Sequence, residues 1–326
     1  MIEMDSSDLI ESTVTSTRVR LARNLFSYPF PDKLDEKRAR EIIRVVGYEL
    51  NLLDTFTEYD IGKIEPDEAT FLLEKHLISP DLIRRKSISA AFITSDEEIS
   101  VMINEEDHLR EQYILRGCNL YKAYERISGI DDGLARSVSF AYDEKLGYLT
   151  ACPSNLGTGM RASVMMFLPG LAKYKRLEEL MPSLKANGLT VRGVFGEGTA
   201  AEGYSYQISN ERTLGVSETD ILSLMNEVTL NLAELEARAR ERSARGAYSI
   251  MSGMARNSGV TMVRCTASAW VRSQSPPTSD SPSARRVEAK RTHRVSTASA
   301  AAWGEISSQR RRARPSRSRK CPWAPA

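Results

Sequence analysis

Two arginines near the start of this 326-residue chain could bind phosphate. Arg18 and Arg20 lie two positions apart in the segment Ser16 to Arg20, and side chains alternate along an extended chain, so both guanidinium groups point the same way. Two guanidinium groups on one face suit a polyphosphate, which accepts bidentate hydrogen bonds. Taken alone, the pair is better explained as two solvated residues of an edge strand.

Three consecutive acids, beginning at Glu105, follow the apolar segment that ends at Ile103. Like charges at adjacent positions repel one another unless cations lie nearby. An acidic turn is the ordinary explanation of such a run. The presence of His108 and Arg110 at the same strand end favours a functional explanation.

Two glycine-rich segments are candidate loops of a site. Residues 152–163 combine Arg161 and hydroxyl side chains with Gly157 and Gly159, which would let the backbone come close to a ligand. This segment matches neither a Walker A loop nor a dinucleotide fingerprint, and a tight turn remains open. Residues 192–203 contain four glycines after a predicted strand, a pattern typical either of a closing loop or of a flexible connector.

Considered together, these clusters favour a nucleotide-binding site more strongly than any one of them does alone. Many arginines without a Walker lysine favour a nucleotide whose phosphates are held by guanidinium groups. Two candidate carboxylates and the isolated Cys152 accompany them. The arginines are Arg18, Arg20, Arg110, Arg161 and Arg192.

The elements that must position these residues are predicted from periodicity. Apolar spacing predicts helices over residues 35–54 and 171–186 and a long helix from Ser217, whose hydroxyl and Asp220 form a capping box. Residues 88–104 and 137–152 are expected to form hairpins, and residues 160–168 and 189–195 single strands. Hairpins with separate helices predict an α+β domain with a mostly antiparallel sheet.

The charge distribution divides the chain near residue 245. Residues 246–326 carry a net charge of +12 with 15 serines and neither Leu nor Phe, whereas the first 245 residues carry −10. A segment without those apolar residues does not build a packed core. We therefore expect a loose leader over residues 1–13, a folded domain over 14–245, and a basic, disordered tail over 246–326.

Other classes of protein are excluded by composition. The longest uncharged apolar stretch, Ala162 to Ala172, has 11 residues and is broken by Pro169, which is too short to span a membrane. The acidic N-terminus has no signal-peptide pattern. Four distant cysteines form neither a CxxC zinc pattern nor a disulfide framework, so a reducing, cytoplasmic setting is the simplest interpretation.

The motifs resemble, in order and spacing, the catalytic domain of the phosphagen kinases over residues 14–245. The form is closest to the bacterial protein arginine kinases of the McsB type. The resemblance implies a glutamine synthetase-like fold, an antiparallel sheet flanked by helices. It rests on the runs STRVRLARNL, EKHLISP, INEEDHLR, GYLTACPSNLGTGMRASV, VRGVFGEG and YQISNERTLG.

The resemblance also implies roles for individual residues. Glu106 would hold the substrate guanidinium and act as base, Glu197 would be the second carboxylate, with Glu202 as a weaker candidate, and Cys152 would be the reactive cysteine. Mg²⁺ would enter with ATP and be held through phosphate oxygens, without protein ligands. The ATP site would comprise Ser16, Thr17, Arg18, Val19, Arg20, His76, Arg110, Arg161, Ala162, Ser163, Val164, Met165, Arg192, Gly193, Val194, Phe195, Gly196 and Glu197.

The leading hypothesis is an ATP-dependent kinase of arginine side chains in proteins, with an activator protein and Clp-type protease machinery as partners implied by the resemblance. The alternatives are a kinase of free arginine or another small guanidino compound, and a catalytically weak nucleotide-binding regulator. The helical domain that precedes the motifs in creatine and arginine kinases is missing before Ser16, which disfavours the small substrate. Nucleic-acid binding through the tail is disfavoured by the acidic body.

The tail departs from the family pattern. Protein arginine kinases continue into a helical domain with an RDxxRA signature, which residues 246–326 lack. An Arg/Ser/Ala/Pro-rich segment of this kind is typical of a frameshifted reading of a GC-rich gene. The alternative is a genuine basic tail for an anionic partner.

Overall fold

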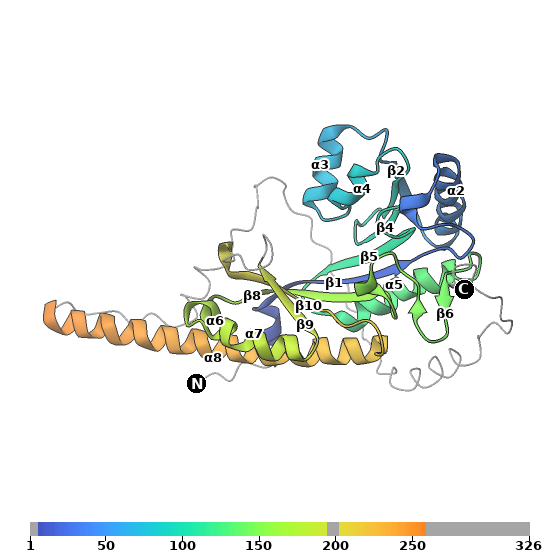
Figure 1. Ribbon diagram of the computed structural model, residues 1–326. Helices are drawn as coiled ribbons and strands as arrows, with labels where there is room; N and C mark the ends of the chain where they lie inside the picture. Colours follow the sequence, from blue (N-terminus) through green and yellow to red (C-terminus); the bar gives the residue numbers. More distant parts are fainter. Residues whose placement is uncertain (1–5, 194–201, 259–326) are drawn as a thin grey trace, which may run out of the picture. The chain divides into compact units, whose positions relative to one another are not determined.

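The fold is built on one antiparallel sheet. The structure, a computed structural model, describes residues 6–193 and 202–258. Eight strands follow the order β2-β3-β4-β5-β1-β8-β10-β9, and each neighbouring pair is antiparallel (Figure 1). This confirms the predicted fold class. The strands are β1 (Val14–Arg23), β2 (Phe56–Asp60), β3 (Ala90–Thr94), β4 (Ile99–Ile103), β5 (Leu109–Arg116), β8 (Met160–Phe167), β9 (Leu189–Gly193) and β10 (Ser205–Asn210).

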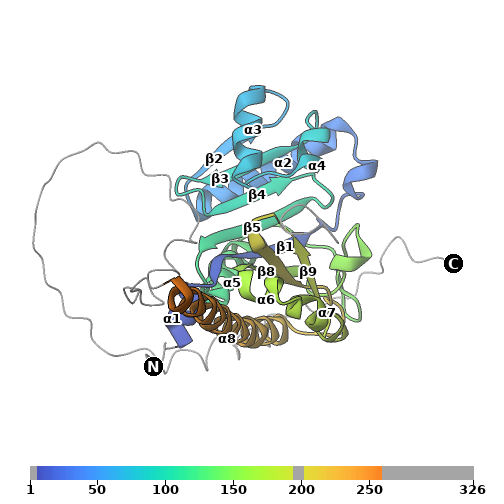
Figure 2. The same cartoon turned by 90° about the vertical axis from the view of Figure 1, so that its left-hand side faces the viewer.

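The main core lies between one face of this sheet and the helices that cover it (Figure 2). The longest of these helices are α2 (Glu36–Leu53), α5 (Leu120–Leu134) and α8 (Glu218–Ser258). In α2, the side chain of Asp35 caps the first turn, and Ile42, Val46 and Leu50 are fully buried at helical spacing. Gly47 is required there, because an added Cβ would lie 2.3 Å from the ring of Phe92 on β3.

On the second face of the sheet, the helices of the described residues pack over β3 and β4. Helices α3 (Pro66–Glu74) and α4 (Pro80–Arg84) form a smaller core against these two strands, which includes Leu82 and Met102. Because side chains alternate along a strand, the same face continues over β5, β1 and β8 with the residues that are not in the main core. Those residues include the arginines of the predicted site.

The predicted helix over residues 171–186 is two helices in the structure. They are α6 (Pro169–Lys173) and α7 (Arg176–Ala186). The helical conformation is interrupted between them at Lys175, which has a left-handed backbone with φ 55°. The start of α6 is held by Glu236 of α8, whose carboxylate accepts hydrogen bonds from the backbone N–H groups of Gly170 and Leu171, both at 2.8 Å. This carboxylate fixes α8 against α6.

Both ends of the catalytic domain differ from the prediction. Residues 6–11 of the expected loose leader form helix α1 (Ser6–Glu11), and the following Thr13 and Val14 are buried. The predicted boundary after residue 245 falls inside α8, which continues through Ser258. The tail from residue 259 lies outside the described residues. Over the part of the chain that is described, no helix has the length and apolarity to cross a membrane.

Candidate active site

Arginines of three adjacent strands lie side by side on the second face of the sheet. Arg20 on β1 pairs in register with Arg161 on β8, and Arg18 lies two residues from Arg20 on the same face. Arg110 projects from β5, the strand on the other side of β1. The intervening residues, such as Val19, point into the main core. The predicted alternation is thus confirmed, but in the interior of the sheet rather than at an edge.

These arginines repel one another. Burial and the charges of Arg110 and Arg161 lower the pKa of Arg18 to about 10. Burial and the charges of Arg18, Arg110 and Arg161 hold the pKa of Arg20 well below its usual value, opposed by Glu105. Burial and the nearby charge of Arg192 lower the pKa of Arg161. The electrostatic coupling therefore links all five arginines that the sequence singled out.

No carboxylate neutralises the centre of this cluster within the described residues. Arg18, Arg20 and Arg161 form no ion pair there, and the buried Nε atoms of Arg20 and Arg161 have no hydrogen-bond partner. A buried donor without a partner is costly, and a buried charge without a counter-ion more so. The cluster is therefore preorganised for a polyanion that would supply both the acceptors and the negative charge.

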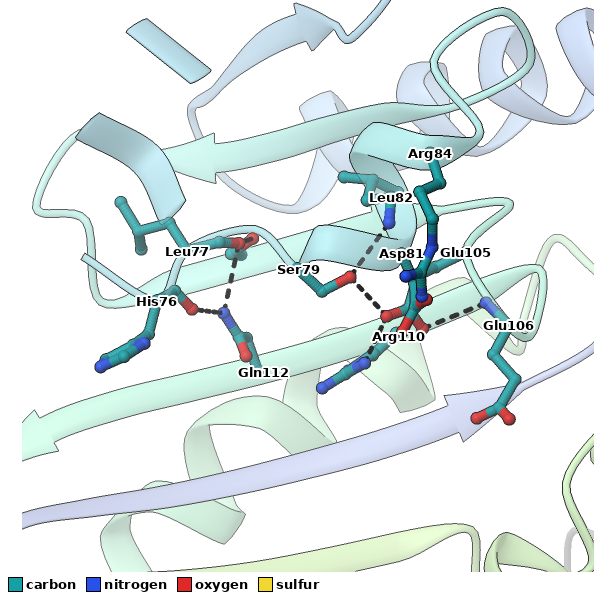
Figure 3. A network of polar contacts seen from close by, with 11 residues as sticks. His76, Leu77, Ser79, Asp81, Leu82, Arg84, Glu105, Glu106, Arg110 and Gln112 are labelled. Atoms are coloured by element: carbon teal, nitrogen blue, oxygen red, sulfur yellow. Dashed lines mark hydrogen bonds and ion pairs between the residues drawn. The ribbon is translucent and has the colours of Figure 1, made fainter. Parts of the chain in front are cut away.

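Glu105, the first acid of the predicted cluster, is a structural residue. It is 1% exposed, forms an ion pair with Arg110, and accepts hydrogen bonds from Ser79 Oγ at 2.5 Å and from the backbone N–H of Glu106 at 3.1 Å (Figure 3). Ser79 also caps α4 by accepting from the N–H of Leu82. Glu105 thus fixes both the acidic loop and the guanidinium of Arg110.

Glu106 is the acid that remains available. Its side chain points away from the Glu105 network in Figure 3 and is exposed to solvent. Partial burial and the charges of Asp107 and Glu105 raise its pKa, opposed by Arg110 and by a hydrogen bond with the Cys152 thiol. A carboxylate crowded by other acids is stabilised by an incoming cation.

Asp107 and His108 attach the acidic loop to its neighbours. Asp107 Oδ1 accepts from Asn24 Nδ2 at 2.5 Å and from the backbone N–H of Ala151 at 2.7 Å, which ties the loop to the residue before Cys152. His108 Nδ1 accepts from the N–H of Leu25 at 3.0 Å, and burial lowers the pKa of His108 to about 4, so its ring is neutral. The role of Asn24 could not be predicted from the sequence, because its partners are distant in the chain.

The arginines and the acids meet in a cavity of about 200 Å³. The acids of the lining can attract a cation and the arginines an anion. A cationic acceptor and a phosphate would therefore be brought together in this cavity. The segment with Ser154 and Asn155 closes a further side. The charged lining residues are Arg20, Glu105, Glu106, Asp107, Arg110 and Arg161.

The glycines of the 152–163 segment serve the protein's own packing. Gly157 has φ +110°, and an added Cβ would lie 2.3 Å from the carbonyl oxygen of Thr213. Gly159 has φ +62°, and its Cβ would lie 2.6 Å from the carbonyl oxygen of Ala22. These contacts and the positive φ angles fit the alternative of a tight turn, although Gly159 also lines the cavity.

The structure divides the predicted ATP-site residues into those on or near the arginine face of the sheet and those buried on the opposite face. His76 lies close to Arg18, whose charge adds to burial in lowering the pKa of His76. By strand alternation Ser16, Ser163 and Met165 share the arginine face. In contrast, the side chains of Thr17, Val19, Ala162 and Val164 are buried on the opposite face and do not reach it.

The rest of the predicted ATP site follows β9. Gly193 ends this strand, next to Arg192. Val194, Phe195, Gly196 and Glu197 lie outside the described residues, as does the side chain of Glu202.

An anion site of arginines and a carboxylate that can take a cation, facing each other in one cavity, define the class of phosphotransferases with a cationic acceptor. The family model for ATP:guanido phosphotransferase, C-terminal catalytic domain, matches residues 39–239. The chain belongs to this family and is a guanidino phosphotransferase.

Individual proteins are similar to large parts of the chain. A protein-arginine kinase of Clostridium acetobutylicum is 43% identical over 261 residues, which is 78% of this chain and 77% of that protein. A protein-arginine kinase of Caldanaerobacter subterraneus subsp. tengcongensis is 43% identical over 236 residues, 71% of this chain and 70% of that protein.

Solved structures show the same fold. The substrate-free duplicated taurocyamine kinase from Schistosoma mansoni has a TM-score of 0.63 at 30% identity, and the match covers 72% of this chain and 35% of that one. A lombricine kinase has a TM-score of 0.61 at 29% identity, with 72% of this chain and 70% of that chain covered.

Proposed function

We propose that this enzyme transfers the γ-phosphoryl group of ATP to the guanidinium group of arginine residues in proteins. The observation that carries the proposal is the cavity in which Glu106 lies together with Arg20 and Arg161, two arginines that form no ion pair within the described residues. The similarity to protein-arginine kinases at 43% identity supports arginine in proteins as the acceptor.

The arginine cluster would bind the phosphates of ATP. Arg18, Arg20 and Arg161 would donate to phosphate oxygens, and the negative charge would remove the repulsion that now lowers their pKa values. Within the described residues, no group of three acidic, His or Cys side chains could hold a metal ion. Mg²⁺ would enter with ATP as part of the substrate, bound through phosphate oxygens, as the family resemblance implies.

Glu106 would orient the arginine of the substrate and take its proton. A guanidinium is a poor nucleophile, because it is protonated and its lone pairs are delocalised. As a guanidinium nitrogen forms its bond to the γ-phosphorus, the bond from phosphorus to the bridging oxygen breaks, ADP leaves, and the proton passes to Glu106. Glu197, as the second carboxylate, and Cys152, beside Glu106, remain predictions from the family resemblance.

A small guanidino compound is the second candidate acceptor, favoured by the fold similarity to taurocyamine and lombricine kinases. Incubating the purified chain with MgATP and either an arginine-rich protein or free arginine separates the two, with phosphoarginine measured by mass spectrometry. We expect phosphoarginine in the protein sample. Product from free arginine alone would assign the enzyme to the small-substrate kinases.

The partners implied by the resemblance, an activator protein and Clp-type protease machinery, stay predictions, as does a cytoplasmic location. Testing them requires the cellular context. The site described above depends on none of them.

A further inference from the structure

We infer that Gln112 is a positioning residue for nucleotide binding: its amide fixes the backbone of His76 and thereby the place of the imidazole ring. The inference rests on the proposed function, because it concerns the arginine cluster to which ATP would bind. Gln112 lies on β5, on the same face as Arg110, and pairs in register with Arg20 of β1. Its effect on the nucleotide passes through His76.

His76 occupies a position of the fold at which glycine is usual. Helix α3 ends at Glu74, and the N–H of His76 bonds back to the carbonyl oxygen of Leu73 at 2.9 Å. The N–H of Leu77 bonds back to the carbonyl oxygen of Leu72 at 3.0 Å, and the two bonds together form a Schellman motif. His76 takes the left-handed backbone of this motif, with φ 59°, which costs less for glycine than for a residue with a side chain. The end of the helix therefore gives no reason for a histidine here.

The conformation at His76 is held by the side chain of Gln112. Gln112 is 1% exposed, and its Nε2 donates to the carbonyl oxygens of His76 at 2.7 Å and of Leu77 at 3.2 Å (Figure 3). A side-chain amide has two N–H donors, which matches these two consecutive carbonyl groups. Holding both groups limits rotation of the backbone at His76, and with it the direction in which the ring leaves the chain.

The ring of His76 lies near the arginine cluster and points away from the Gln112 amide in Figure 3. Burial and the charge of Arg18 lower the pKa of His76 below its usual value, so the ring is neutral at pH 7. A neutral imidazole adds no positive charge to the cluster and has one donor and one acceptor nitrogen. Because the side chain of His76 is also accessible to solvent, a nucleotide held by Arg18 can contact it.

The segment that carries His76 is attached to the protein by other contacts as well. Leu77 and Ile78 are buried in the smaller core, and Ser100 Oγ on β4 donates to the carbonyl oxygen of Leu77 at 2.5 Å. The particular contribution of Gln112 is its hydrogen bond to the carbonyl of His76 itself. Loss of the amide should therefore displace the ring while the segment stays attached.

The position of the ring is tested without ATP. The chain has three histidines, and the variant His76→Ala identifies the NMR signals of the His76 ring. Gln112→Leu should raise the pKa of His76 toward its usual value, because the ring moves away from Arg18 and into solvent. Ser100→Ala removes a buried hydrogen bond to the same segment but none to the carbonyl of His76, and should leave this pKa unchanged. An unchanged pKa in Gln112→Leu, or an equal rise in Ser100→Ala, would overturn the inference.

The consequence for the nucleotide is tested by calorimetric titration with MgATP. Gln112→Leu should weaken ATP binding by about tenfold in the wild-type background, and by less than about twofold when His76 is already alanine. Ser100→Ala should leave the affinity within about twofold of the wild type. An equal loss in both backgrounds would mean that Gln112 acts on the nucleotide independently of His76, and would contradict the inference.

Failure of the proposed function gives a different result. ATP affinity that depends on Gln112 as expected, without phosphoarginine on protein or free arginine, would contradict the proposed function and support the role of Gln112. Wild-type ATP affinity of Gln112→Leu, with phosphoarginine formed on protein, would do the reverse. Thermal unfolding shows which variants are folded during the measurements. Where Gln112→Leu is not, Gln112→Met, which keeps the length of the side chain without its donors, takes its place.

Discussion

Glu106 differs from its two acidic neighbours because its carboxylate is not used in holding the protein together. Glu105 binds Ser79 and Arg110, and Asp107 binds Asn24 and Ala151. The sequence alone could not separate the three acids, since their roles depend on partners from distant segments. The family resemblance selected Glu106, and the hydrogen bonds explain why the other two are unsuitable as a base.

Glu106→Gln should abolish most of the activity while leaving nucleotide binding intact. The amide keeps the shape of the side chain but cannot accept the proton, so phosphorylation should fall by about 10²-fold or more. The rate is measured as phosphoarginine formed, and ATP affinity by calorimetry. Turnover at the wild-type rate would remove Glu106 from the mechanism.

Arg161→Gln should weaken ATP binding and at the same time stabilise the ligand-free protein. Loss of a charge-assisted contact to phosphate should weaken ATP binding by about 10- to 100-fold. Without ATP, the same variant should unfold at a higher temperature, because it removes a charge that its neighbours repel. Calorimetric titration and thermal unfolding of the ligand-free protein test the two parts. Unchanged ATP affinity would argue against phosphate binding by the cluster.

Cys152 should react with a thiol reagent faster than Cys118. Burial raises the pKa of Cys118, so its reactive thiolate is scarce at neutral pH and increases only as the pH rises further. Cys152 is only partly buried and lies near Arg161 and Glu106. Mass-spectrometric labelling at pH 7 follows both thiols, with MgATP and substrate expected to protect Cys152. Equal rates at the two positions would contradict this account.

At the scale of elements, hydrophobic periodicity predicted helices and strands whose buried face consists of apolar residues. The helix expected over residues 35–54 is α2, and the strands expected around residues 95–97 are β3 and β4. Strand β5 was missed because its core face includes the fully buried Glu111, which lies beside Arg23 and Asp131. A buried carboxyl of this kind looks like a surface residue in the sequence. Its pKa is raised well above the usual value by burial and by Asp131.

The attachment of α8 to α6 should depend on Glu236. This residue is fully buried and accepts hydrogen bonds from two N–H groups of α6 and from Arg240. Glu236→Ala leaves these donors without a partner and should lower the free energy of unfolding by about 3–5 kcal/mol. Glu234→Ala, in the same helix, removes only an exposed pair with Arg238 and should cost less than about 1 kcal/mol. Equal losses in denaturant unfolding would mean that Glu236 does not anchor α8.

At the scale of the whole molecule, the residues of the site fall in the first part of the chain, before the change in composition that the sequence shows. The described arginines and acids of the site lie between Arg18 and Arg192, the arginines on strands of one continuous sheet and the acids in the loop between β4 and β5. Composition located the change near residue 245 because residues 246–326 carry a net charge of +12 and contain neither Leu nor Phe. The predicted boundary falls inside α8, which continues to Ser258.

Limited digestion with trypsin should therefore stop later than composition alone suggests. Residues 259–326 contain many arginines and neither Leu nor Phe, so burial cannot offset the entropy of ordering them, and they should be cut quickly. Cleavage should slow close to the end of α8, near Ser258 rather than at Arg245, and mass spectrometry of the product locates the site. The trimmed protein should bind ATP with the affinity of the full chain, because every arginine of the cluster is retained. A tail that resists trypsin, or ATP binding that is lost with it, would mean that the tail folds onto the catalytic domain.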